Sequence, residues 1–323
     1  MFLDLAQRGD YHRAMNLNLV LRRLTAVLVL ALLPAGLGAG TFRVATYNVE
    51  NYLDQPTESR PVKSARARAS VRDSIRAMNP DVLALEEIGG VSALMELRAS
   101  LKADGLDYSY WEFVDGMDTN IHVAVLSRLP IVERRPHTND VFLLDGRRFH
   151  VSRGFAEVDI RAAPNLTFTL MATHLKSRRP APDADEAQLR LEEARVLRGI
   201  LDERFRADAN ARLIVLGDFN DLKDSDPVKT VIGHGRFKLV DTRPAERNGD
   251  NAPNPIPYFE PRNITWTHYY GKEDTYSRVD YILLSPAMSR HWLTNGTCVL
   301  TRPNWGVASD HRPIVATFKT END

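Results

Sequence analysis

The chain contains a single cysteine and has no excess of charge of either sign. Cys298 is the only thiol among 323 residues, so no disulfide can form within one chain. Lysine plus arginine and aspartate plus glutamate number 42 each, which gives a formal net charge of zero. This balance argues against binding of nucleic acid through bulk charge, but it leaves local basic patches open. Cys298 lies in an apolar run, which predicts a buried and inert thiol.

No apolar run in the chain is long enough to span a bilayer comfortably. The candidate nearest to that length is the run 24–33, which follows a basic pair and precedes small residues up to Gly40. This order is typical of a secretory signal peptide, and we predict cleavage after Ala39. Residues 1–14 form a polar lead upstream of a second candidate start at Met15. We therefore expect a secreted or periplasmic protein, with an uncleaved N-terminal membrane anchor as the alternative.

Many short strands and few helices are predicted after this segment. Helices are expected at about 64–78, 91–102 and 184–206, the last from one apolar stripe spaced by three or four residues. Strands are expected at 41–48, 81–87, 108–114, 122–127, 131–135, 154–160, 166–173, 212–216, 263–266, 278–284, 296–300 and 314–318. Asp145-Gly146 predicts a hairpin turn. The pattern favours a single-domain α/β sandwich, in which two sheets pack face to face and helices cover the outside.

The most informative stretch is Val215–Asn220, where an apolar run ends in Gly-Asp-Phe-Asn. In a strand, Asp218 and Asn220 point to the same side. A carboxylate and a carboxamide that project together suit work on a phosphate. The acid can hold a metal or take a proton from water, and the amide can fix an oxygen. The alternative is a strand that runs into an Asx turn.

Other predicted strand ends also present polar residues that packing does not require. They are Asn48, Glu87, His174, Asp280, Asp310 and His311. Each one alone is explained by a cap or a turn, but their joint occurrence at strand ends is hard to attribute to turns. Alternation along the strand predicts that Glu86 points to the opposite sheet face from Glu87 and has a structural role.

Six motifs occur in order along the chain: Thr46-Tyr47-Asn48-Val49-Glu50, Leu85-Glu86-Glu87, Thr173-His174, Gly217-Asp218-Phe219-Asn220, Arg278-Val279-Asp280-Tyr281 and Ser309-Asp310-His311-Arg312-Pro313. In this order they resemble the signatures of the endonuclease/exonuclease/phosphatase superfamily, the relatives of deoxyribonuclease I and exonuclease III. The resemblance spans residues 41–319. It implies a four-layered α/β sandwich with two packed mixed β-sheets flanked by helices. It also implies one catalytic domain over residues 40–323, behind the signal peptide at 1–39.

The resemblance further implies a metal-dependent hydrolase that cleaves phosphodiester bonds by attack of water. A phosphodiester is anionic, so cleavage needs a divalent ion on a non-bridging oxygen and a positive hydrogen-bond donor. The expected cofactor is Mg²⁺, with Mn²⁺ or Ca²⁺ as alternatives, because these hard ions prefer oxygen ligands. An exported nuclease is expected first. A phosphatase, a sphingomyelinase-like phospholipid phosphodiesterase and a catalytically inactive binding module are the alternatives.

The matched motifs imply roles for individual residues. Glu87 resembles the family's main metal ligand, with Asn48 and Asp310 as helpers. His311 and Asp280 look like the family's histidine–carboxylate pair. In such a pair the carboxylate orients the imidazole and favours its charged form.

The remaining matched residues are expected to act on the water and the phosphate. Asp218 and His311 are alternative general bases, and Asn220 would orient either Asp218 or a phosphoryl oxygen. His174 would donate to the phosphate or protonate the leaving oxygen. Glu50 lies where some relatives carry an acid near the metal.

Basic and aromatic residues near these motifs bear on the substrate. Arg153 precedes a strand where nucleases of this family keep a phosphate-contacting arginine, and a surface arginine is the alternative. Lys176 and Arg178 follow His174 closely and could track a polyanion. Tyr269, Tyr270 and Tyr276 could stack on bases or sugars. We therefore expect a phosphodiester substrate, in the first place nucleic acid, and a monomer without a stable protein partner.

Overall fold

The computed structural model describes residues 40–58, 60–247 and 266–321. The predicted signal peptide at 1–39 lies outside the described residues, as does most of the strand predicted at 263–266. Within the described ranges, no helix is long and apolar enough to cross a membrane. Cys298 is buried, as its apolar surroundings predict.

Two mixed β-sheets form the centre of the described chain. The first has the order β12-β16-β17-β1-β2-β4-β3, with bounds Ala245–Glu246, Trp292–Val299, Ile314–Lys319, Thr41–Tyr52, Val82–Ile88, His122–Ser127 and Tyr110–Val114. The second has the order β11-β15-β10-β9-β8-β5, with bounds Val240–Asp241, Asp280–Leu284, Leu213–Asp218, Leu166–His174, Phe155–Ala163 and Ile131–Arg134. The predicted strands at 154–160 and 166–173 are observed as β8 and β9. Their predicted pairing is confirmed, because they are antiparallel neighbours.

The two sheets pack against each other through one apolar face of each. Val44 and Ala84 of the first sheet and Leu170 and Ile214 of the second belong to one buried cluster. Within it the Phe42 ring stacks on Phe168 at 5.3 Å between centroids. This alternation of inward apolar residues is the pattern expected of packed sheets.

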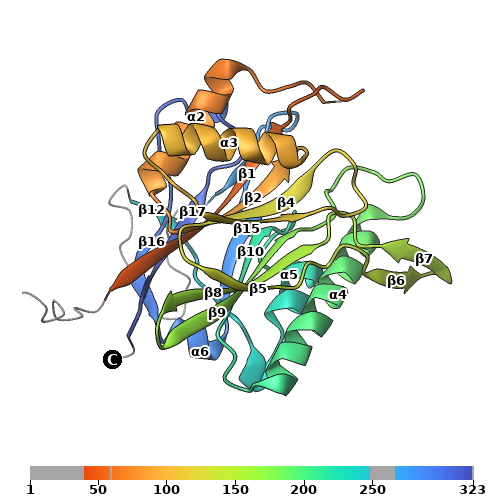
Figure 1. Ribbon diagram of the computed structural model, residues 1–323. Coiled ribbons are helices and arrows are strands. Elements are labelled where there is room, and N and C mark those ends of the chain that lie inside the picture. The colour runs from red at the N-terminus through yellow and green to blue at the C-terminus, as the bar shows by residue number, and fades with distance from the viewer. Residues whose placement is uncertain (1–39, 59, 248–265, 322–323) are drawn as a thin grey trace, which may run out of the picture. The chain divides into compact units, whose positions relative to one another are not determined.

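Helices cover the outer face of each sheet, which makes four layers (Figure 1). The helices α2 (Ala65–Met78) and α3 (Val91–Ala103) pack on the first sheet, and α4 (Glu186–Ala207) and α5 (Asp226–Ile232) pack on the second. The long helices confirm the predictions from periodicity. The sequence did not predict α5 or α6 (Pro286–Ser289), because neither has enough turns to show a period.

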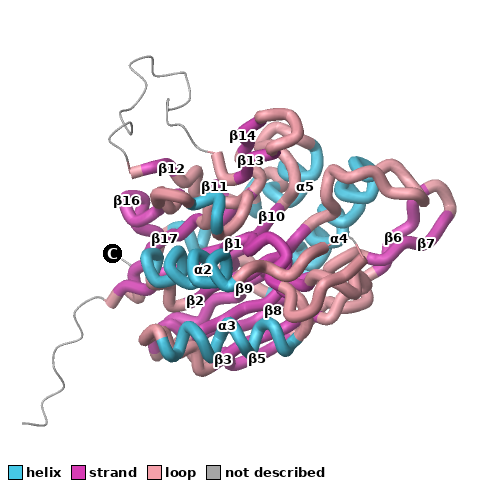
Figure 2. Tube along the Cα trace, turned by 90° about the horizontal axis from the view of Figure 1, so that it is seen from above, coloured by secondary structure: helices cyan, strands magenta, loops and turns pink. Residues whose placement is uncertain are grey.

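Among the described residues, two hairpins lie outside the two large sheets. The first joins β6 (Val141–Leu144) to β7 (Arg147–His150) through the predicted Asp145-Gly146 turn, whose residues have φ of 50° and 75°. Figure 2 shows it projecting beyond α4. The second joins β13 (His268–Tyr270) to β14 (Thr275–Ser277) and lies at a different edge of the view.

Strand polarity brings the polar motifs to one end of the sandwich. Strands β1 and β2 run parallel, as do β9 and β10, so their carboxyl ends lie together. Strands β17 and β15 are antiparallel to β1 and β10, so they begin where these end. Asp280 opens β15 and His311 precedes β17, so these two residues lie at the amino ends of their strands.

A buried ion cluster joins β8 to the segment that follows β5 and to α4. Glu157 has no exposed surface, and its carboxylate lies 2.6 Å from Arg135 Nε, 2.6 Å from Arg204 Nε and 2.9 Å from His137 Nε2. Burial alone would raise the pKa of Glu157. Hydrogen bonds from His137, Arg135 and Arg204 outweigh burial and lower this pKa from 4.5 to about 2.

Replacement of Glu157 by glutamine is expected to cost about 2 kcal/mol of unfolding free energy at pH 7. The pKa shift corresponds to roughly 3 kcal/mol, and screening at the partly exposed Arg204 reduces that figure. The folded-state pKa is depressed, so this stability is present above about pH 4.5 and is lost as pH falls toward 2. Urea unfolding at pH 7 and pH 3 measures both effects. Glu133→Gln removes an exposed partner of Arg135 and should cost under about 1 kcal/mol; equal losses in the two variants would contradict the prediction.

Candidate functional site

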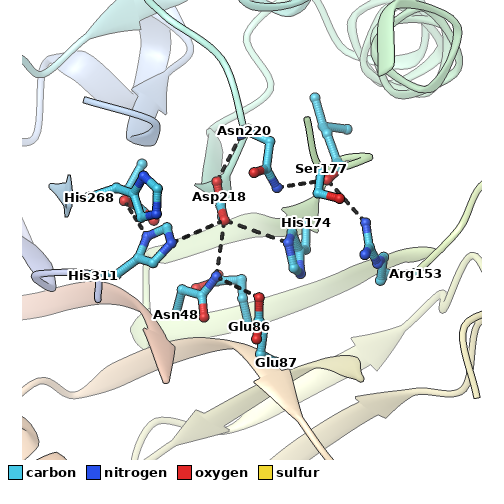
Figure 3. Close-up of polar contacts among 12 residues, drawn as sticks. Asn48, Glu86, Glu87, Arg153, His174, Ser177, Asp218, Asn220, His268 and His311 are labelled. Atoms are coloured by element: carbon cyan, nitrogen blue, oxygen red, sulfur yellow. Dashed lines mark hydrogen bonds and ion pairs between the residues drawn. The ribbon is translucent and has the colours of Figure 1, made fainter. Parts of the chain in front are cut away.

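Asp218, the last residue of β10, lies at the centre of the converging polar groups (Figure 3). It is 1% exposed, and its Oδ2 accepts a hydrogen bond from Asn48 Nδ2 at 3.0 Å. His174 Nε2 and His311 Nε2 lie 3.5 Å and 3.7 Å from the same oxygen. One carboxylate oxygen is therefore shared by an amide and two imidazoles from separate parts of the chain.

His311 and Asp280 form the predicted histidine–carboxylate pair. His311 Nδ1 lies 2.9 Å from Asp280 Oδ2, and both side chains are buried. The Ser309 hydroxyl accepts from His311 N at 3.0 Å and donates to Asn48 O at 2.8 Å, which fixes the segment against β1. Burial lowers the pKa of His311, but the charges of Asp280 and Asp218 outweigh it, and the pKa lies well above its usual value.

The two histidines beside Asp218 have opposite charge preferences. Burial lowers the pKa of His174 well below its usual value, and the charge of Arg153 lowers it further, so its imidazole is neutral. Burial raises the pKa of Asp218 to about 6, against the opposing charge of His311. A charged and a neutral imidazole thus lie near one weakly basic carboxylate.

Asn220 reaches this site by a turn rather than by strand alternation. It lies two residues beyond the end of β10 and has a φ of 53°. Its backbone N–H donates to Asp218 Oδ1 at 2.8 Å, which is the Asx-turn contact, and its Nδ2 donates to Leu175 O at 3.0 Å. The predicted Asx turn is therefore present, and it places the Asn220 side chain beside Asp218 (Figure 3).

Glu86 follows the alternation of β2, because it shares the parity of Val82 and Ala84, which face the second sheet, and it lies near Asp218 on that side. Glu86 is fully buried and accepts a hydrogen bond from Thr46 Oγ1 at 2.6 Å. Glu87 has a φ of 62°, where the register between β2 and β4 shifts, and its side chain turns back toward Asn48. Both glutamates therefore lie near Asp218 (Figure 3). Burial raises the pKa of Glu86 well above its usual value, which favours its neutral form.

Oxygen ligands suited to a divalent cation gather around Glu87. Its Oε1 lies 3.4 Å from Asn48 Nδ2, and its side chain is 17% exposed. Burial raises the pKa of Glu50, and the negative charge of Asp310 raises it further. These effects outweigh the opposite effect of Lys63, whose Nζ lies 3.4 Å from Glu50 Oε2. Mutually repelling carboxylates beside an amide are a donor set that fits Mg²⁺.

Two tighter groups contain nitrogen ligands. The ligand atoms of Asp218, Asp280 and His311 lie within 4.8 Å of one another, as do those of His268, Asp310 and His311. His311 belongs to both, and the charges of Asp280 and Asp218 favour its protonated form, whose ring nitrogens do not coordinate a metal. The carboxylate-rich region around Glu87 is therefore the better candidate for a hard cation.

The structure separates the three predicted substrate-binding residues. Arg153 is 5% exposed and donates to Asp118 Oδ2 at 3.2 Å and to Leu175 O at 3.3 Å, so its interpretation as a surface arginine is wrong. Lys176 donates from Nζ to backbone oxygens of its own loop, including Arg179 O at 3.1 Å. Arg178 is half-exposed and donates to Asn220 O at 3.0 Å, which places it at the rim of the site.

Two residues of the site were missed from the sequence. Arg60 Nη1 lies 3.6 Å from Glu87 Oε2, and the Arg60 charge contributes to the lowered pKa of His174. The ring of His268 lies on that of His311, with 4.5 Å between centroids (Figure 3). Neither lies in a periodic segment, so no local signal singled them out.

Several solved structures have a similar fold. Sphingomyelinase C from Streptomyces griseocarneus matches with a TM-score of 0.58 and 19% identity, covering 87% of this chain and 100% of that one. The catalytic domain of human nocturnin, with bound sulfate, matches with a TM-score of 0.58 and 16% identity, covering 87% of this chain and 95% of that one. Truncated TDP2 from Caenorhabditis elegans matches with a TM-score of 0.56 and 16% identity, covering 87% of this chain and 98% of that one. At these identities the likeness shows the fold alone.

Comparison with known protein families gives a direct assignment. A search of curated proteins by sequence finds no match. The sequence profile of the Endonuclease/Exonuclease/phosphatase family, however, matches residues 45–311, which run from β1 to His311. Members of this family are hydrolases that act on phosphoester bonds, and enzymes of this fold use divalent metals. The chain therefore belongs to the endonuclease/exonuclease/phosphatase family.

Proposed function

We propose that the protein is an exported, Mg²⁺-dependent phosphodiesterase, and within that class a nuclease. The observation that carries this proposal is the carboxylate of Asp218 with His311 and His174 near the same oxygen. Hydrolysis of a phosphodiester needs a base for water, a positive donor for the phosphoryl oxygens and a donor for the leaving oxygen. This arrangement supplies all three within one buried polar cluster.

Each residue has a role that follows from its protonation. Asp218 takes the proton of the attacking water, because a pKa of about 6 leaves it ionised and basic enough at neutral pH. His311, held charged by Asp280, donates to a non-bridging phosphoryl oxygen. His174 is neutral and donates to the phosphate or to the leaving oxygen.

The acids near Glu87 complete the site. Glu87 and Asp310, with the oxygen of Asn48, would hold the divalent cation, and Glu50 lies close to them. Such a cation supplies Lewis-acid stabilisation of the phosphoryl oxygens when bound. Mn²⁺ or Ca²⁺ could replace Mg²⁺ at oxygen ligands of this kind.

Removal of divalent metal is expected to abolish phosphodiester hydrolysis. With bis-p-nitrophenyl phosphate as substrate, EDTA should reduce the rate to background, and excess Mg²⁺ should restore it. Glu87→Gln should lower kcat/KM by about 100-fold or more, because it removes a charged ligand. Glu133→Gln, an exposed change of the same type, should leave the rate unchanged. A rate that is the same in EDTA, Mg²⁺ and the Glu87 variant would leave only the inactive binding module.

A phospholipid phosphodiesterase is the second candidate. The exposed side chains of Val141 and Leu143, at 46% and 68%, give the β6–β7 hairpin an apolar surface suited to a lipid interface. A panel of plasmid DNA, RNA, sphingomyelin and phosphoinositides decides between the two. Nicking of plasmid supports the nuclease. Lipid cleavage without nicking reverses the ranking.

Export is a separate part of the proposal and rests on the sequence of residues 1–39. N-terminal sequencing of protein recovered outside the cytoplasm should begin near Gly40. Full-length chain in a membrane fraction would instead support the N-terminal anchor.

A further inference from the structure

The β13–β14 hairpin is tied directly to the catalytic segment. His268 forms an antiparallel bridge with His311, and Tyr269 N donates to Asp310 O at 3.0 Å. Arg312 N donates to Thr267 O at 2.6 Å. The hydroxyl of Thr267 accepts hydrogen bonds from the backbone at the start of β15, from Val279 N at 3.1 Å and Asp280 N at 3.2 Å. The hairpin therefore has a fixed position relative to the His311–Asp280 pair.

The two faces of this hairpin have different surroundings. Tyr269 and its cross-strand partner Tyr276 lie on one face, where their rings are 4.8 Å apart and Tyr276 contacts Trp266 at 4.8 Å. His268 and Tyr270 alternate with Tyr269, so they lie on the opposite face, which is the face of His311.

His311, His268 and Tyr270 form a row of rings that leads outward from the site. The centroids of His311 and His268 are 4.5 Å apart, and those of His268 and Tyr270 are 6.4 Å apart with 30° between planes. The exposed fraction rises along the row, from 6% at His311 to 21% for the His268 side chain and 40% at Tyr270. A group attached to a phosphate bound at His311 would thus meet planar, partly exposed rings.

We propose that His268 and Tyr270 form a subsite that stacks on the unpaired base next to the scissile phosphate of a single-stranded or frayed nucleic acid. This inference rests on the proposed function and names its substrate class. Every base has a flat face that can stack on an aromatic ring, whereas an acyl chain has none. A quaternary ammonium headgroup also binds aromatic rings. Vesicles that display such a headgroup are therefore included in the test.

The test compares two oligomers of equal length and charge: oligothymidylate and an oligomer of abasic tetrahydrofuran units. Binding is measured by fluorescence anisotropy in EDTA, so that hydrolysis does not interfere. The wild-type protein should bind oligothymidylate about 5- to 100-fold more tightly than the abasic oligomer. Tyr270→Ala should remove most of this preference, and Tyr270→Phe should retain it. Tyr276→Ala, a more exposed ring on the other face, should also retain it.

The results separate this inference from the proposed function. Metal-dependent cleavage of bis-p-nitrophenyl phosphate with no preference between the oligomers would overturn the subsite and leave the phosphodiesterase standing. A preference that survives Tyr270→Ala would also overturn it. Binding to sphingomyelin vesicles that is lost on Tyr270→Ala would assign the row to a lipid headgroup instead.

Discussion

Replacement of His311 by alanine is expected to lower kcat on bis-p-nitrophenyl phosphate by about 10³-fold or more. The variant loses the charged imidazole that lies between Asp280 and Asp218, and with it the donor for the phosphoryl oxygens. A positioned acid or base contributes 10²- to 10⁴-fold, and loss of one donor to an oxyanion costs a similar amount. His291→Ala is the matched control, because His291 is equally buried but bonds Lys319 O, away from the site. Comparable losses of kcat in the two variants would contradict the assignment.

A second variant tests whether His311 and Asp280 act as a unit. Asp280→Asn keeps the shape of the side chain but removes the charge that favours the imidazolium. Its effect on kcat should largely disappear in the His311→Ala background, because groups that act together are not additive. Fully additive losses would show that Asp280 acts without His311.

The secondary structure was predictable where local signals are strong. The helix at 64–78 is observed as Ala65–Met78, and Ser64 caps it by accepting from Ala67 N at 3.2 Å. The strand at 296–300 was placed too late, since β16 begins at Trp292. An irregular register between Leu293 and Cys298 breaks the alternation on which that prediction depended.

The sequence motifs identified residues that the structure brings together, but they did not predict how the side chains are oriented. Alternation by two holds only while the backbone stays extended. Glu87 and Asn220 both adopt a left-handed φ, at 62° and 53°, and this brings their side chains to the site. Glu86, by contrast, keeps the alternation of Val82 and Ala84 in the same strand. Such non-glycine residues with positive φ are uncommon and are often found at functional sites, and their sequence gives no sign of them.

The cations of the site were predicted least well. Arg60 comes from a loop and His268 from the three-residue strand β13, and only tertiary structure brings them to Glu87 and His311. Arg153 was identified from the resemblance, but its burial against Asp118 depends on a loop contact that no local pattern shows. Proximity between segments distant in sequence is thus the part of this site that composition and spacing do not determine.

Replacement of Gly217 by alanine is expected to prevent stable folding, with a loss of about 4 kcal/mol or more of unfolding free energy. Gly217 has a φ of 133°, and a Cβ there would lie 1.9 Å from Thr173 O on the parallel neighbour β9. The contact is with backbone, so it can be relieved only by moving β10 away from β9. Asp218 is the next residue, so the same movement would carry its carboxylate away from His174.

Urea unfolding and soluble yield measure the loss of stability in Gly217→Ala, and a matched glycine supplies the control. Gly199 lies inside α4, and nothing stands within 4 Å of a Cβ built there. Gly199→Ala should therefore stabilise the protein by about 0.5–1 kcal/mol through helix propensity. Wild-type stability in Gly217→Ala would mean that β9 and β10 can separate without cost. That result would show that the 3.5 Å distance between His174 Nε2 and Asp218 Oδ2 does not depend on the pairing of β9 with β10.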